Sequence, residues 1–89
     1  MRLLVERSKT ITVRVRIAGE EHSVKGKATE KYIKELADIV DTKIKQIQKH
    51  NPNLTRHRTA ILAAINLADE LQKVKAEYQE LLQIMEEAN

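Results

Sequence analysis

The chain has 89 residues, enough for one small domain, and it contains no Cys, Phe or Trp. The lack of Cys excludes disulfides and thiolate ligands, and the three His residues show no ligand spacing, so we expect no metal and no cofactor. No apolar run approaches the ~20 residues that cross a bilayer, so we expect a soluble cytoplasmic protein with no membrane partner.

Charge is distributed unevenly along the chain. Residues 1–58 hold fourteen basic and seven acidic side chains, a net charge of +7. Residues 59–89 hold two basic and six acidic side chains, a net charge of −4. The sequence therefore joins a basic front half to an acidic back half.

A β-hairpin is predicted near the N-terminus. Residues 1–9 show no sustained period and are expected to form a flexible arm. Ile11, Val13, Val15 and Ile17 then alternate with polar residues, which is typical of a strand with one buried face. A turn at 18–21 containing Gly19 leads into a short second strand over 21–25.

Two helices are predicted after the hairpin. Thr29 is a suitable N-cap for the first, which should end near His50 because Asn51 precedes a proline. Its core face consists of Ile33, Leu36, Ala37, Val40, Ile44 and Ile47. Thr55 can cap a second helix that continues to the end of the chain without Gly or Pro.

The second helix opens with AILAAINLADEL, which is apolar almost all the way round. Apolar residues then recur at alternating steps of four and three, the spacing of a coiled coil. We predict that this row forms an oligomer interface, whose members are Ala60, Ala64, Leu67, Leu71, Val74, Tyr78, Leu81 and Met85. A monomer with a frayed tail is the alternative, but it would leave this row in water.

The predicted fold is therefore of the α+β class. A small ββαα head, made from the β-hairpin plus a helix, is followed by a long C-terminal coiled-coil helix. The expected division is a flexible arm over 1–9, a globular head over 10–66 that includes the root of the long helix, and a coiled-coil stalk over 67–89.

The sequence shows no catalytic constellation, so we predict that the protein is not an enzyme. Two glycines cannot form a phosphate-binding loop, and the adjacent Asp69 and Glu70 point about 100° apart on a helix. Ser8 and Ser23 have no evident base. A binding or scaffolding role is the remaining expectation.

Basic residues form two strips. The first strip consists of Arg14 and Arg16 on the solvent face of the strand, with Lys25 and Lys27. The second group surrounds the connection between the helices: Lys43, Lys45, Lys49, Arg56 and Arg58. A solvated surface is the plainest interpretation. Nucleic-acid binding is a rival, although interspersed acids and the lack of stacking aromatic residues argue against it.

At the second helix the sequence resembles a known family. Residues 63–71, AAINLADEL, resemble the central motif of the ZapA family of small FtsZ-associated bacterial division proteins. ITVRVRIAG resembles the family's opening strand and turn, and IKELADIVDTKIKQI resembles its first helix. NPNLTRHRTAIL resembles its connector, so the likeness extends over residues 10–89.

The resemblance implies a head that forms a homodimer, a C-terminal coiled coil, and an antiparallel tetramer of two dimers. It implies no enzymatic activity. It also implies a cell-division scaffold at the midcell septum that binds FtsZ protofilaments and bundles them, promoting Z-ring assembly. The alternatives are a basic nucleic-acid-binding oligomer and a generic coiled-coil interaction module.

Two departures from the family pattern affect the expected filament contact. Some members have Arg directly after the turn glycine, where this chain has Glu20, and a basic loop residue of some members falls near Pro52. The candidate filament-binding residues are therefore Lys45, Lys49, Arg56, Arg58, Arg14 and Arg16. The stalk is also short, about three heptads from Leu67, whereas some relatives continue much further.

Overall fold

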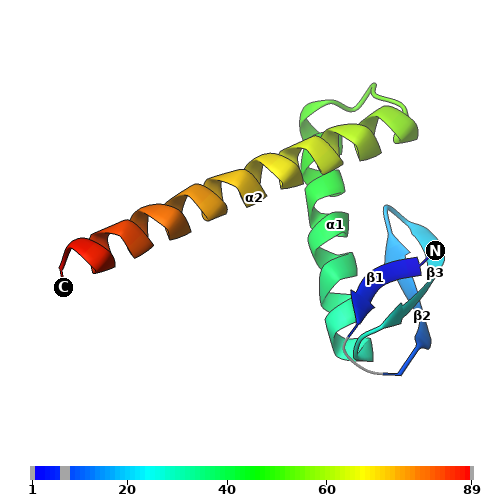
Figure 1. The fold of residues 1–89 in the computed structure, drawn as a ribbon. Coiled ribbons are helices and arrows are strands. Elements are labelled where there is room, and N and C mark those ends of the chain that lie inside the picture. The colour runs from blue at the N-terminus through cyan, green and yellow to red at the C-terminus, as the bar shows by residue number, and fades with distance from the viewer. Residues whose placement is uncertain (1, 7–8, 89) are drawn as a thin grey trace. The chain divides into compact units, whose positions relative to one another are not determined.

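The structure is a computed structural model that describes residues 2–6 and 9–88. Its elements, in chain order, are β1 (Arg2–Glu6), β2 (Ile11–Ile17), β3 (Glu20–Lys27), α1 (Glu30–His50) and α2 (Arg56–Glu87) (Figure 1). They divide into two compact units, residues 1–54 with the sheet and α1, and residues 55–89 with α2.

The first unit contains a three-stranded sheet in the order β1-β3-β2. β2 and β3 pair antiparallel, as the hairpin prediction requires, while β1 pairs parallel to β3. The prediction of a flexible arm over residues 1–9 is therefore wrong for Arg2–Glu6, which form a strand; residues 1, 7 and 8 lie outside the described residues. RLLVE lacks the alternation of a half-buried strand, so its strand conformation depends on pairing with β3 rather than on a local pattern.

The hairpin turn consists of Ala18 and Gly19 alone. Both have positive φ, 54° and 78°, and such a two-residue connection matches the twist of the flanking strands. β3 runs from Glu20 to Lys27, longer at both ends than the predicted 21–25. The strand continues beyond Lys25 through Gly26, which pairs with Ile11 of β2.

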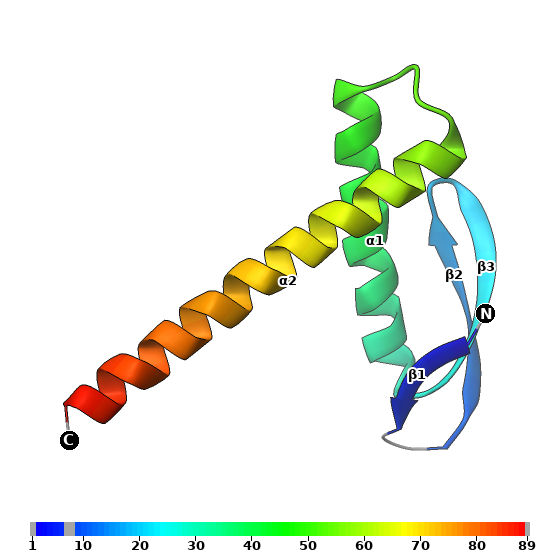
Figure 2. The ribbon, with the colours of Figure 1, turned by 45° about the horizontal axis from the view of Figure 1, so that its top comes forward.

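The core of the first unit lies between the sheet and α1. Val13 and Val15 are buried on β2, whereas the intervening Arg14 is exposed, which confirms the predicted alternation. They pack with Ile33 and Ala37 of α1 in one cluster that also contains Ala28. Figure 2 shows α1 running along the hairpin. The buried residues of this cluster are all aliphatic, as the composition required.

α1 begins and ends where the sequence predicts. The hydroxyl of Thr29 accepts a hydrogen bond from the amide of Tyr32 at 3.2 Å, which satisfies one of the unpaired donors of the first turn. The helix ends at His50, immediately before Asn51 and Pro52. Of the predicted core face, four residues are buried and two are partly buried; these are Ile33, Ala37, Ile44 and Ile47, and then Leu36 and Val40.

The second unit is essentially one helix of 32 residues, α2. The Thr55 hydroxyl accepts a hydrogen bond from the Arg58 amide at 3.1 Å, so the predicted cap is confirmed. No acidic residue lies in the first turn and no basic residue in the last. Arg56 and Arg58 lie near the start, and Glu86 and Glu87 near the end, so both ends oppose the helix dipole.

The boundary between the compact units differs from the predicted one. The prediction was residue 66, where the apolar circumference of the second helix narrows. In the structure the boundary falls between Leu54 and Thr55, in the connection between α1 and α2. A change of apolar pattern within a continuous helix does not interrupt its backbone hydrogen bonds, so the helix remains one unit.

Candidate functional site

The described residues contain no group of three or more His, Asp, Glu or Cys that could hold a metal ion. A search of those same residues finds no helix with the length and apolarity needed to cross a membrane. One surface depression of about 450 Å³ lies along α1 and is lined by Glu30, Lys31, Lys34, Glu35 and Asp38. All five lining residues are charged side chains of one helix, and Lys34 pairs with Glu30 at 3.1 Å, so we interpret this depression as a solvated helix face.

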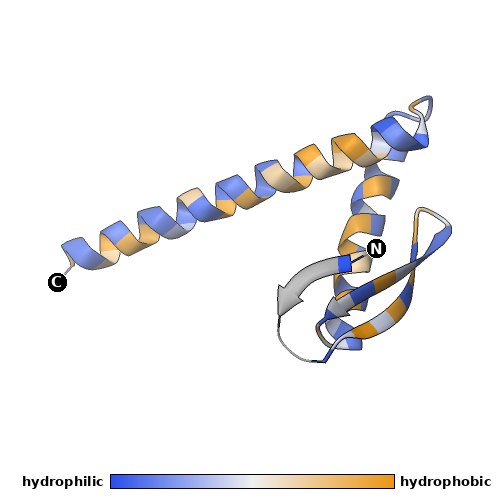
Figure 3. Cartoon of the chain, turned by 45° about the vertical axis from the view of Figure 1, so that its right-hand side comes forward, coloured by the Kyte–Doolittle hydropathy of each residue, from blue (hydrophilic) through white to orange (hydrophobic). Residues whose placement is uncertain are grey.

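An exposed apolar row on α2 is the main surface feature. The α2 stripe, as we call it, comprises Leu71, Val74, Tyr78, Leu81 and Met85, all 54–61% exposed. Figure 3 shows apolar patches recurring along this helix. Residues at steps of three and four share one helix face, so these five side chains form a continuous row. A row of large apolar side chains in water indicates a surface that another chain covers.

The predicted interface begins before this stripe. Ala60 and Ala64 are exposed and Leu67 is partly buried. The residues immediately before the two alanines, Thr59 and Ala63, are 2% exposed, and the Thr59 hydroxyl donates to the carbonyl oxygen of Thr55 at 2.8 Å. The interface role of all eight predicted residues stays a prediction.

Part of the exposed apolar surface was not predicted from the sequence. Leu82 and Ile84, at 41% and 55% exposure, lie next to stripe residues and widen the apolar surface near the end of α2. The adjacent apolar pairs Leu81-Leu82 and Ile84-Met85 were the available signal. On α1, Ile39 is 54% exposed, because it lies off the periodic face that meets the sheet.

The candidate basic residues of α1 lie near its C-terminal end. The Lys45 ammonium is 2.9 Å from Asp41 Oδ2, while Lys49 is exposed in the last turn, where a cation complements the helix dipole. The hydrogen bond from Lys45, followed by the one from the Ala18 amide, lowers the pKa of Asp41. Lys45 therefore has an acidic partner within its own helix, whereas Lys49 projects into solvent.

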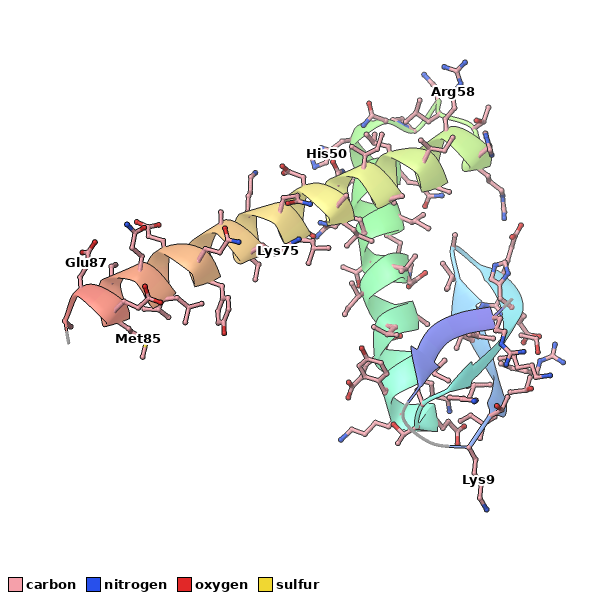
Figure 4. The ribbon with its side chains drawn as sticks, in the orientation of Figure 1. Lys9, His50, Arg58, Lys75, Met85 and Glu87 are labelled. Carbon is pink, nitrogen blue, oxygen red and sulfur yellow. The ribbon has the colours of Figure 1, made fainter. Side chains whose placement is uncertain are left out.

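Arg56 and Arg58 belong to the other compact unit. Both are exposed in the first turn of α2, and Figure 4 shows Arg58 pointing away from its own helix. Cations in a first turn oppose the helix dipole, so they do not stabilise α2 through it. Their placement at the start of the helix is better suited to contact with an anionic partner than to helix stability.

Arg14 and Arg16 lie on the open face of the sheet, the face opposite α1. The Arg14 guanidinium contacts Glu21 Oε2 at 2.6 Å, and both side chains are more than half exposed. Arg16 is exposed and pairs across the sheet with Glu21 in the backbone register. The six candidate basic residues therefore occupy three separate elements, β2, the end of α1 and the start of α2.

Comparison with known proteins identifies the family. The sequence model of the family described as cell division protein ZapA matches residues 13–89. The chain is similar to a cell division protein ZapA of Geobacillus sp. (strain WCH70), 38% identical over 80 residues, covering 90% of this chain and 91% of the relative. A second relative of the same name, from Bacillus thuringiensis (strain Al Hakam), is 32% identical over 80 residues, with 90% of each chain covered.

A solved structure agrees with the sequence relatives. The fold is similar to a ZapA mutant dimer from Geobacillus stearothermophilus, with a TM-score of 0.68 and 27% identity, covering 94% of this chain and 95% of that one. The family match, the relatives and the fold point to the same group of proteins, and the chain belongs to the cell division protein ZapA family.

Proposed function

We propose that this protein is a non-enzymatic scaffold of bacterial cell division that self-associates through α2 and binds FtsZ protofilaments through basic residues. An assembly with several filament-binding surfaces would link neighbouring protofilaments and bundle them. Its location would be the cytoplasmic side of the division septum at midcell. Family membership supports the role in division, and the resemblance of the sequence to FtsZ-associated proteins supports the partner.

The exposed α2 stripe carries this proposal. Leaving five large apolar side chains more than half exposed is unfavourable, and burial of a Leu-sized side chain is worth about 1.5–3 kcal/mol. Pairing with a second copy of the same helix would cover the stripe. The related dimer from Geobacillus stearothermophilus supports this choice of partner. A homodimer is the minimal assembly, and an antiparallel tetramer would add tail-to-tail pairing of the helices.

Linkage converts weak filament contacts into strong ones. A protein with one filament-binding surface can coat a filament but cannot join two. Two linked surfaces raise the effective concentration of the second contact, so the overall avidity exceeds either affinity. The basic front half of the chain suits an acidic partner, and such contacts weaken as salt rises. We assign the filament contact to Lys45, Lys49, Arg56, Arg58, Arg14 and Arg16.

Co-sedimentation with FtsZ tests this function. FtsZ would be assembled with GTP, and the fraction of this chain in the pellet would be measured between about 50 and 300 mM salt, a range over which screening changes strongly. We expect pelleting that falls with salt, together with thicker bundles in electron micrographs. If the chain stays in the supernatant at every salt concentration, the proposed partner is wrong.

A pair of variants separates binding from bundling. Leu71→Lys should still pellet with single filaments but should form few bundles, because it interrupts self-association. Lys49→Glu combined with Arg58→Glu should reduce pelleting while the oligomer remains intact. If this second variant pellets like the parent protein, the filament contact lies elsewhere.

A further inference from the structure

The outer edge of β2 is a regular strand edge with no strand beyond it in the described sheet. β2 lies at the end of the order β1-β3-β2. Its seven residues pair with β3 without a bulge, from Ile11 opposite Gly26 to Ile17 opposite Glu20. Proteins often protect such edges with a bulge, a proline or a very short strand. β2 has none of these features, and its protection is of another known kind, the charged side chains of Arg14 and Arg16, which disfavour a basic strand but not an acidic one.

The outward backbone groups belong to identifiable residues. Ile17 and Glu20 flank the two-residue turn and form the closing hydrogen-bonded pair. Hydrogen-bonded and non-hydrogen-bonded pairs alternate along an antiparallel ladder. The odd-numbered residues of β2 therefore direct their backbone groups toward β3, while Thr12, Arg14 and Arg16 direct theirs outward.

The same residues supply positive charge at that edge. Arg14 and Arg16 project from the open face of the sheet. Glu21 lies 2.6 Å from Arg14. No acidic partner for Arg16 is found among the described residues. One of the two arginines is therefore paired with a carboxylate and the other is not, so the β2 edge combines outward backbone donors and acceptors with an excess of positive charge.

A second copy of β2 is a poor occupant of this edge. If two copies of β2 paired antiparallel along their whole length, the Arg14 side chains of both copies would lie directly opposite each other. Both Arg16 side chains would lie nearby on the same face. Like charges directly opposite one another destabilise paired strands. A strand with carboxylates at these positions would instead pair favourably with the arginines.

We propose that the outer edge of β2 binds an extended acidic peptide segment by strand addition. The bound segment alternates carboxylate and small aliphatic residues. Its backbone pairs with Thr12, Arg14 and Arg16, and its carboxylates face the two arginines. Its aliphatic side chains lie on the other face, level with Val13 and Val15. This binding mode goes beyond the filament crosslinking proposed above and does not depend on which protein supplies the segment.

The test uses a synthetic octapeptide of alternating Glu and Val, blocked at both ends, and the full ¹⁵N-labelled chain. In the free protein, the amide protons of Thr12, Arg14 and Arg16 should exchange faster with solvent than those of Val13 and Val15. A saturating concentration of the peptide should slow the amide exchange of Thr12, Arg14 and Arg16 at least about tenfold. If they are already as slow as Val13 in the free protein, the edge is occupied and the proposal is wrong.

Matched peptides identify the contacts. Replacing Glu by Lys should abolish binding, and N-methylation of the backbone edge that faces β2 should also abolish it. Equal binding of the Lys peptide would overturn the charge selectivity, and equal binding of the methylated peptide would overturn strand addition. Binding that leaves the three amides unprotected would place the site elsewhere.

Variants of the protein complete the test. The double variant Arg14→Glu with Arg16→Glu should bind the Glu-Val peptide at least about tenfold more weakly than the parent does, and it should bind the Lys-Val peptide in preference. The matched control is Lys31→Glu with Lys34→Glu, which changes net charge equally on α1, on the opposite side of the sheet from Arg14 and Arg16, and should bind the peptide like the parent. If the parent chain does not bind the Glu-Val peptide but still co-sediments with FtsZ, strand addition alone is rejected, so the two proposals fail separately.

Discussion

The backbone amide of Ala18 donates a hydrogen bond to Asp41 Oδ1 at 2.8 Å, joining the hairpin turn to the middle of α1. The other carboxylate oxygen of Asp41 lies 2.9 Å from the Lys45 ammonium. One partly buried carboxylate therefore connects the turn to a candidate filament-binding lysine. Sequence separation of 23 residues makes this a tertiary contact rather than a local one.

Asp41 should contribute to the pH dependence of folding. Its pKa is lowered in the folded chain, first by the hydrogen bond from Lys45 and then by that from Ala18. The stabilisation is therefore complete above the ordinary Asp pKa of about 3.9 and is lost as pH falls through the lower folded value. Asp41→Asn should reduce the fall in Tm on acidification, measured by circular dichroism between about pH 2 and 6.

Asp38→Asn is the control for this prediction. Asp38 is exposed on the same helix. Its replacement should leave the acid-induced fall in Tm nearly as steep as in the parent chain. Equal slopes for Asp41→Asn and the parent would show that the carboxylate of Asp41 does not carry the effect.

Replacing Ala18 by Gly and replacing Gly19 by Ala should change the free energy of unfolding in opposite directions. Ala18 has φ of 54°, a left-handed conformation that costs an L-residue about 1–2 kcal/mol, so Ala18→Gly should relieve that strain. Because Gly gives the unfolded chain more conformational freedom than Ala does, about 0.4–1 kcal/mol of the stability gained by relieving the strain is lost again. Gly19→Ala should destabilise by about 1 kcal/mol through its positive φ alone, because a Cβ there meets nothing within 4 Å.

Urea unfolding of both turn variants gives the comparison. The expected order of unfolding free energy is Ala18→Gly at or above the parent, and Gly19→Ala below it. A stabilised Gly19→Ala variant would contradict the conformational explanation.

Two isoleucines of α1 provide a matched pair for the core. Ile33 is 2% exposed and packs against the buried valines of β2, so Ile33→Ala should cost about 2–5 kcal/mol. Ile39 is 54% exposed, and Ile39→Ala should change stability by less than about 0.5 kcal/mol. Chemical denaturation measures both. A large loss for Ile39→Ala would mean that another chain covers this residue.

The α2 stripe should control the oligomeric state. Leu71→Lys replaces a residue that is 57% exposed in the single chain and should weaken association at least about tenfold, since each buried Leu contributes about 1.5–3 kcal/mol. Gln72→Lys adds the same charge one position away, off the stripe, and should leave association nearly unchanged. Sedimentation velocity over a concentration series distinguishes them. An unchanged mass for Leu71→Lys would contradict the interface assignment.

Most of this fold was predictable because its signals are local. Alternation over Ile11–Ile17 identified β2, and the hydroxyls of Thr29 and Thr55 marked both helix starts. The likeness of residues 63–71 to a family motif indicated the family from nine consecutive residues. These features depend on periods, capping residues and short motifs whose members lie within a few positions of one another.

Long-range contacts were the features that local patterns did not predict. β1 forms by pairing with a strand about twenty residues later, and RLLVE alone carries no alternating signal. The bond from Ala18 to Asp41 requires the turn to meet α1, which no spacing in the sequence reveals. Within the candidate site, sequence predicted the basic residues and the apolar row, but not that Glu21 contacts Arg14 rather than Arg16.

The reversed charges at the ends of α2 give this chain two opposing responses to ionic strength. Arg56 and Arg58 near the start, and Glu86 and Glu87 near the end, each oppose the helix dipole, by an amount on the order of 0.3–1 kcal/mol per charge. Added salt screens that repulsion and should increase the helical content of α2, while it weakens contacts between basic residues and an acidic partner. A rise in salt concentration therefore increases the order of this helix while it weakens the binding of the protein to its acidic partner.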